Sequence, residues 1–184
     1  MILEAIIIGL ILSKFFNGNF DNFNKFNLKG KSLIVIGIIS NLLIILFTSY
    51  DFKIITYTVI KYYEYFHIIS FAVLIIGLLF NYDNFGIILI SIGLILNLVP
   101  IILNGKMPVD YEALLLTNNN RLIDIISKGR SLSHIVLDNP KARILSDIIA
   151  ITSPYPMPKV ISIGDILISV GLICSLILIS RRKS

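Results

Sequence analysis

The stretch Phe85–Leu103, FGIILISIGLILNLVPIIL, decides the fold because it carries no charged residue over the length of a membrane helix. Its only polar side chains are those of Ser91 and Asn97. About 17 to 25 predominantly apolar residues cross the roughly 30 Å hydrocarbon core of a bilayer as a helix. We therefore expect a transmembrane helix here.

Four further apolar stretches of similar character flank it, namely Ile2–Phe16, Ser32–Ser49, Tyr62–Phe80 and Val160–Ser180. The chain is 56% hydrophobic and 15% charged, with a mean hydropathy of +0.89, which is far more apolar than a soluble domain. We expect an all-α, polytopic transmembrane bundle of about five spans, with a long irregular or short-helical extramembrane loop before the last span. Because the first stretch is short and contains Glu4, four spans are the alternative.

The predicted spans divide the chain into three parts. Residues 1–103 form a four-helix membrane region with an interfacial loop at 17–31, in which Phe20, Phe23 and Phe26 would share one face of a helix. Residues 104–159 form an extracytoplasmic loop, and residues 160–184 form the final span and a basic cytoplasmic tail. The turn-forming residues 81–84 predict a hairpin between the third and fourth spans.

Basic residues indicate the orientation of the bundle. Lys and Arg concentrate after the first span and at the C-terminus, at Lys14, Lys25, Lys29, Lys31, Arg181, Arg182 and Lys183. Cytoplasmic loops carry such an excess, and five spans place both segments on the same side. We therefore expect a multi-pass protein of the cell (plasma) membrane, with its N-terminus outside and its C-terminus in the cytoplasm. Because Met1–Leu12 lacks the basic start of a signal peptide, we expect it to be retained.

Small and hydrogen-bonding residues recur four apart within the spans, in the pairs Gly37 and Asn41, Gly93 and Asn97, and Gly171 and Ser175. Each pair lies on one helix face, which favours close helix packing. The alternative is a polar seam along a substrate path, as in a small transporter subunit.

Metal and cofactor sites are not expected. Glu64 and His67 have the spacing of ligands in di-metal bundles, but the other helices lack a second such pair. Cys174 is the only cysteine, so an intrachain disulfide is excluded.

The loop contains most of the distinctive sequence. Asn104, Gly105, Met107 and Pro108 form a turn that ends the fourth span, while Ser162 and Gly164 belong to a capping box closed by Asp165. Between them we expect short helices at Tyr111–Leu116 and Arg121–Ser127, and a helix at Lys141–Ile151 lying on the membrane. The alternating prolines 154, 156 and 158 predict an extended, stiff run.

Four side chains near the loop centre have the residue types of a hydrolase triad, namely Ser131, Ser133, His134 and Asp138. No strand-turn-helix elbow surrounds either serine, so the catalytic residues stay unknown. A looser polar cluster at the outer interface remains the candidate site, and it comprises His134, Asp138, Asp147 and Asp165.

Two segments, Leu145-Ser146-Asp147-Ile148-Ile149 and Pro158–Leu167 with its Ser162-Ile163-Gly164-Asp165 motif, carry a resemblance to a known family. Together with the Asn104–Val109 opening, they resemble an uncharacterised bacterial membrane family, a domain of unknown function. Ser146 stands where that family is expected to have glycine. The resemblance implies an integral membrane protein and no particular reaction.

We expect a non-enzymatic membrane component whose loop caps the helix ends and serves in interaction or ligand binding. A membrane-embedded enzyme and a small transporter subunit are the alternatives. The lipid bilayer is the expected partner, with another membrane protein as a further candidate, and nucleic acid is not expected, because the basic residues lie between the apolar stretches.

Overall fold

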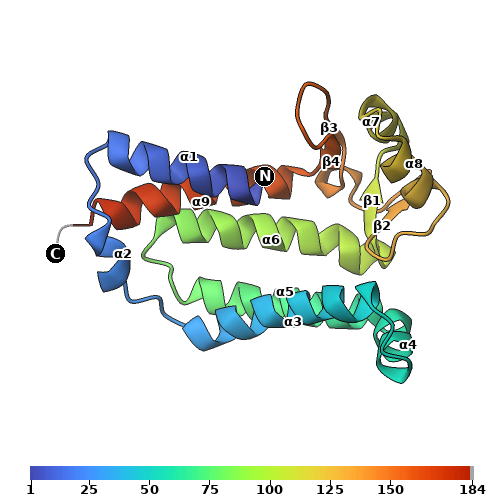
Figure 1. Cartoon of the computed structure of the whole chain (residues 1–184), viewed down its shortest axis with the longest axis horizontal. Coiled ribbons are helices and arrows are strands. Elements are labelled where there is room, and N and C mark those ends of the chain that lie inside the picture. The colour runs from blue at the N-terminus through green and yellow to red at the C-terminus, as the bar shows by residue number, and fades with distance from the viewer. Residues whose placement is uncertain (183–184) are drawn as a thin grey trace.

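The computed structural model describes residues 1–182, so Lys183 of the predicted basic tail lies outside the described residues. Long helices lie side by side, and a folded loop covers one end of them (Figure 1). The long helices are α1 (Ile2–Phe15), α3 (Lys31–Ser49), α5 (Tyr63–Leu79), α6 (Phe85–Asn104) and α9 (Ile163–Ser180). Short helices α2 (Asp21–Lys25) and α4 (Ile54–Lys61) join them.

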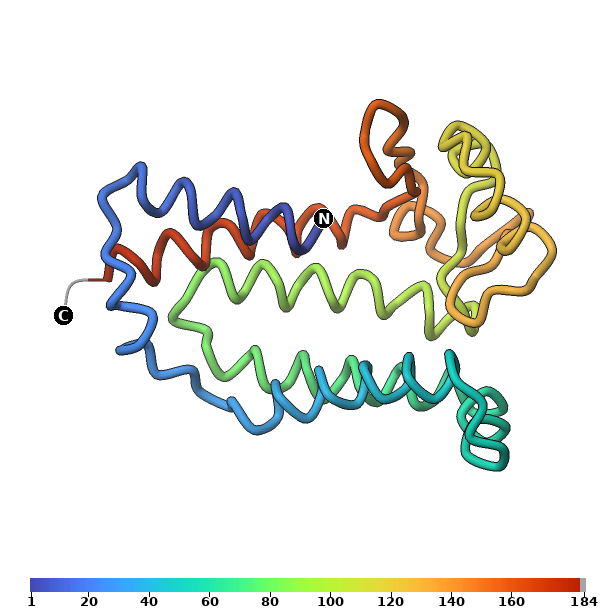
Figure 2. The backbone as a smooth tube through the Cα atoms, viewed as in Figure 1, coloured from blue at the N-terminus to red at the C-terminus, as the bar shows by residue number. Residues whose placement is uncertain are grey.

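The long helices pack in the order α1, α9, α6, α5, α3. The path of the chain in Figure 2 shows that α3 and α6 run toward the covered end, whereas α5 and α9 run away from it. Helix α1 lies beside α9 and runs in the same direction. The turn at 81–84 and the end of α9 therefore lie at the uncovered end of the molecule.

Three of these helices, α3, α6 and α9, are long and apolar enough to cross a membrane. Taken together, α4 and α5 are long and apolar enough to form a fourth candidate span, although the two helices are bent by 75° at their junction. Helix α1 has 14 residues, or roughly 21 Å at 1.5 Å per residue, which is shorter than a bilayer core. Length and composition thus support three or four of the five predicted spans.

Close contact between α6 and α9 depends on glycine. A Cβ atom on Gly93 would lie 2.6 Å from the carbonyl oxygen of Gly164, which is too close for any side chain. Gly93 therefore allows close helix packing, as its spacing from Asn97 predicted. Asn97 itself has a different role, described below.

The covering loop, residues 105–162, is called the cap here. It contains β1 (Met107–Val109), α7 (Tyr111–Leu116), α8 (Asn120–Ser127), β2 (His134–Val136), the 3-10 turn η1 (Arg143–Leu145), β3 (Ile149–Ile151) and β4 (Lys159–Ile161). Strands β1 and β2 pair in parallel, and β3 and β4 pair antiparallel. Val109, Leu114 and Ile126 form a small apolar core of the cap.

The cap confirms some predictions and corrects others. Helix α7 has the predicted bounds, α8 begins one residue early, and the Ser162–Asp165 capping box is present. The all-α prediction is wrong here because of the two small sheets. The predicted helix at 141–151 is also wrong. Within it only the 3-10 turn η1 is helical, whereas Asp147 bridges to β1 and Ile149–Ile151 pairs with β4.

Two other local predictions need correction. Residues 152–158 connect two antiparallel strands, so the proline run turns back as a hairpin and does not extend. In the loop at 17–31 only Asp21–Lys25 is helical, and Phe20 stacks on Phe23 at 5.9 Å between ring centroids. Phe26 leaves the helix in an extended conformation, so the three rings do not share one helical face.

Candidate functional site

Strand β1 brings the two distant halves of the cap together. On one side it pairs with β2, which places His134 opposite Met107. On the other side the Asp147 N–H donates to the Pro108 carbonyl at 3.0 Å, and the Asp110 N–H donates to the Asp147 carbonyl at 2.9 Å. His134 and Asp147, 13 positions apart, are thus held on the two edges of one strand.

The first turn of α9 provides a second carboxylate. Asp165 closes the capping box by accepting the Ser162 N–H at 3.1 Å. Its other oxygen accepts a hydrogen bond from the Asn97 amide of α6 at 2.9 Å, and the Ser162 hydroxyl donates to the Asn97 oxygen at 2.7 Å. Asn97 therefore links α6 to the start of α9, and the closely packed Gly93 and Gly164 allow this approach.

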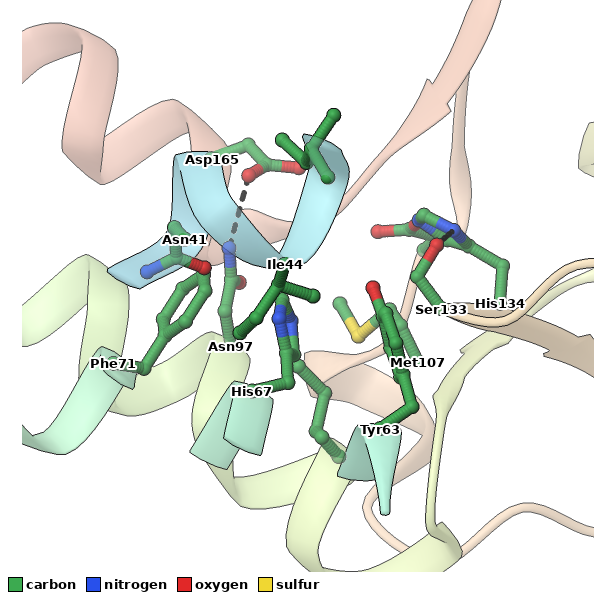
Figure 3. A pocket seen from close by; sticks show the side chains of 13 residues that line it. Asn41, Ile44, Tyr63, His67, Phe71, Asn97, Met107, Ser133, His134 and Asp165 are labelled. Carbon is green, nitrogen blue, oxygen red and sulfur yellow. Dashed lines mark hydrogen bonds and ion pairs between the residues drawn. The ribbon is translucent and has the colours of Figure 1, made fainter. Parts of the chain in front are cut away.

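These groups line a cavity of about 340 Å³ between the cap and the helix ends (Figure 3). Helix α5 contributes a column of rings, in which Tyr63 stacks on His67 at 5.4 Å and His67 contacts Phe71 at 4.6 Å. Apolar side chains complete the wall. The lining residues are Asn41, Ile44, Ile45, Tyr63, His67, Phe71, Asn97, Ile101, Met107, Ser133, His134, Asp147 and Asp165.

A chain of side-chain contacts in the cavity wall runs from Ser133 through His134 to Asp147. The Ser133 hydroxyl lies 2.7 Å from Nδ1 of His134, and Nε2 of His134 lies 3.5 Å from Oδ2 of Asp147. The Asp147 side chain is 6% exposed. Within residues 1–182, no group donates a hydrogen bond to its carboxyl oxygens.

The surroundings of Asp147 and His134 shift the pKa values of both side chains. Burial raises the pKa of Asp147 to about 8, and the nearby charge of Asp165 acts in the same direction. Desolvation in the pocket lowers the pKa of His134, and Asp165 acts against that shift. Near pH 7, Asp147 is therefore mostly protonated beside a neutral imidazole, and the 3.5 Å contact is not a salt bridge.

A second cavity, of about 490 Å³, reaches the same polar groups from the side of α1 and the β3–β4 hairpin. His134, Asp147 and Asp165 line both cavities. Met1, Glu4, Lys159 and Ser169 also line the second one. The three polar residues thus border both cavities.

Of the predicted polar cluster, the structure brings His134, Asp147 and Asp165 together and leaves Asp138 out. Asp138 is exposed on a separate groove with Asp110 and Arg143. The sequence pointed to Asn97 through its spacing from Gly93 and to His67 through its spacing from Glu64, but not to their roles in this site, and Tyr63 was not expected there. The spacing of His67 and Phe71, four and eight residues after Tyr63, indicates a shared helix face.

The predicted structural residues hold the cap on the bundle. Asn104 donates to the Pro100 and Lys141 carbonyls and accepts the Lys141 N–H at 2.9 Å. Gly105 ends α6 with a φ of +80°, which favours glycine. Met107 and Pro108 are buried in β1.

The described residues, 1–182, hold no group of three or more His, Cys, Asp and Glu side chains arranged to bind a metal ion. Glu64 and His67, the pair with metal-ligand spacing, diverge. The Glu64 carboxylate faces Gly105, whereas His67 lines the cavity. The site can instead hold a cation, a hydrogen-bond donor or a proton.

Comparison with known proteins identifies a family for this chain but indicates no activity. The family model described as "Family of unknown function (DUF5317)" matches residues 25–177, which includes every residue of the 340 Å³ cavity and leaves α1 outside. An "Uncharacterized protein" of Thermotoga maritima is 29% identical over 185 residues, covering 100% of this chain and 95% of the relative. No solved structure matches.

Proposed function

We propose, from the premise that this chain belongs to the DUF5317 family of unknown function, that it is an integral membrane protein that binds a small ligand beneath its cap. The long apolar helices and the cavity between their ends and the cap support this function. The chain acts as a binding component in this proposal and not as a catalyst.

The bundle crosses the plasma membrane five times in this proposal, with the cap and the N-terminus outside. The uncovered end carries Lys14, Lys25, Lys29, Lys31, Arg181 and Arg182 against only two acids, Asp21 and Asp83. Basic and acidic residues are balanced at the cap end. This asymmetry favours a cytoplasmic location for the uncovered end. Lipid then covers the apolar outer faces of α3 and α5.

The observation that carries the binding proposal is the Asp147 carboxyl. Its side chain is only 6% exposed, and the carboxyl oxygens are open to the cavity. A carboxyl in so restricted an environment is costly without a partner, so a ligand with a donor group or a positive charge would stabilise it. The apolar lining residues would bury the rest of that ligand.

Native mass spectrometry of the full chain, released from its own membranes into a mild detergent, tests the binding proposal. We expect the wild-type chain to retain a non-covalent small-molecule adduct. Asn41→Trp, which fills the deep end of the cavity, should lose the adduct. Leu42→Trp, on the exposed face one residue along α3, is the matched control and should keep it.

Adduct-free wild-type protein, or equal retention by the two tryptophan variants, would overturn ligand binding in this cavity. Size-exclusion profiles of both variants show whether each one is folded.

A second candidate function, a serine hydrolase, is favoured by one contact, the 2.7 Å approach of the Ser133 hydroxyl to His134. Above pH 8 an ionised Asp147 could accept a hydrogen bond from the Nε2–H of His134, which leaves Nδ1 unprotonated and free to accept the proton of Ser133. Labelling by an alkyl fluorophosphonate at pH 9, abolished in Ser133→Ala, would support this function. Equal labelling of the variant would exclude it.

A further inference from the structure

The charges that face the cavity have one sign. Of its titratable lining residues, Tyr63, His67, His134, Asp147 and Asp165, two carry carboxyl groups, and neither Lys nor Arg lines this cavity. An anionic group would therefore meet unfavourable electrostatics here. A cation would be attracted by both carboxyls.

A second and independent feature is the aromatic column on α5. Tyr63 and His67 stack along one side of the cavity and Phe71 is tilted against His67, while the carboxyl groups lie on other walls. Faces of aromatic rings attract ammonium groups within about 6 Å, and carboxylates complete such sites. Rings and carboxyls together favour an ammonium group over a neutral polyol.

The third feature is the depth of the cavity and its side opening. Asn41 lies about two turns before the end of α3, which is roughly 12 Å along the helix at 1.5 Å per residue. Ile45 lines the cavity and is also 60% exposed on the outer face of α3. The cavity thus opens sideways between α3 and its neighbours, along a wall that includes Ile44 and Ile101.

We propose that this cavity binds an amphiphile with an ammonium head group, which contacts Asp147 and Asp165, while its alkyl chain leaves past Ile44 and Ile45 into the bilayer. This inference rests on the proposed function and adds the chemical class of the ligand. The buried carboxyl of Asp147 then gains a partner. The apolar side opening explains how a ligand of this kind enters without passing through the cap.

The test is equilibrium binding of tritiated dodecyltrimethylammonium to the full chain in maltoside micelles. We expect saturable binding at one site, at least tenfold weaker in Asp147→Asn and in Asp165→Asn. Asp138→Asn removes the same charge from the exposed groove of the cap and should bind as the wild type does. Asp147→Asn keeps the test valid if Asp165→Asn fails to fold, because Asp165 also caps α9.

Two competitors separate the parts of the proposal. 1-Dodecanol shares the chain and lacks the charge, while tetramethylammonium shares the head and lacks the chain; both should compete at least tenfold less well than dodecylamine. Equal competition by dodecanol would overturn the ammonium class, and equal competition by tetramethylammonium would overturn the membrane-derived amphiphile. Absence of dodecyltrimethylammonium binding from a chain that retains a native adduct would overturn this inference alone, whereas absence of both would overturn ligand binding itself.

Discussion

At the scale of single residues, Asp147 and Asp165 show how two like side chains differ through their surroundings. Asp165 has each oxygen hydrogen-bonded, one to the Ser162 N–H and one to Asn97. Asp147 is buried without such donors, so its charged form is disfavoured. The two carboxyl groups therefore differ in their hydrogen bonding although both line the same cavity.

Asp147→Asn should change how stability depends on pH. The pKa of Asp147 is raised from 3.8 to about 8 on folding, so the folded state binds this proton more tightly than the unfolded state does. Stability from this group is fully present below about pH 4 and is lost as pH rises toward 8, by up to about 1.4 kcal/mol per pH unit.

Thermal unfolding in micelles, followed by circular dichroism between pH 5 and pH 9, measures this effect. The melting temperature of Asp147→Asn should fall less with rising pH than that of the wild type, whereas Asp138→Asn should keep the wild-type slope. Parallel curves for wild type and Asp147→Asn would show that Asp147 is ionised in the folded protein.

At the scale of elements, the contact between α6 and α9 determines the geometry of the site. Gly93 allows the two helices to approach, and the amide of Asn97, one turn later, can then reach Asp165 and Ser162. In a bilayer such close backbone packing replaces the hydrophobic drive that joins helices in water. Helix packing and the polar site therefore depend on the same contact.

Gly93→Ala should destabilise the bundle by about 1–3 kcal/mol, because the added methyl group would overlap the backbone of α9. Reaction of the single Cys174 with a thiol-reactive dye on heating reports the unfolding. Ile92→Ala, on the exposed side of the same helix, should shift the melting temperature much less. Equal shifts in the two variants would argue against a tight crossing at Gly93.

At the scale of the whole molecule, the alternation of helix directions places every loop at one of two ends. The cap and α4 lie at one end, and the basic loop with α2 and the 81–84 turn lies at the other, while the N-terminus lies partway along the bundle beside α9. Lys29 pairs with Asp83 at 3.6 Å and Asn22 donates to the Ser180 carbonyl at 2.8 Å, so the basic end is folded together as well. This arrangement is the basis of the five-span proposal.

Single cysteines test that topology in intact cells. With Cys174 replaced by serine, Ser131→Cys in the cap should react with a membrane-impermeant maleimide, and Lys25→Cys should react only after the cells are lysed. Labelling of Lys25→Cys in intact cells, without labelling of Ser131→Cys, would invert the orientation. Labelling of both would contradict an odd number of spans between the two positions.

The amino-acid sequence by itself determined the long helices, the two short helices of the cap and the capping box of α9. These features depend on neighbouring residues, through apolar length, helix periodicity and the side chains at helix starts. The same local rules failed at 141–151 and 152–158, where the backbone pairs with β1 and within the β3–β4 hairpin.

Only the tertiary structure decided which polar residues share a site. The sequence grouped His134, Asp138, Asp147 and Asp165 as one cluster. Pairing with β1 holds His134 and Asp147 together, and the α6–α9 contact adds Asn97 beside Asp165, whereas Asp138 lies on a separate groove. The aromatic column of α5 joined them from a helix that is distant in sequence. Strand register and helix crossing arise from contacts between remote segments, which residue type and spacing along one chain do not specify.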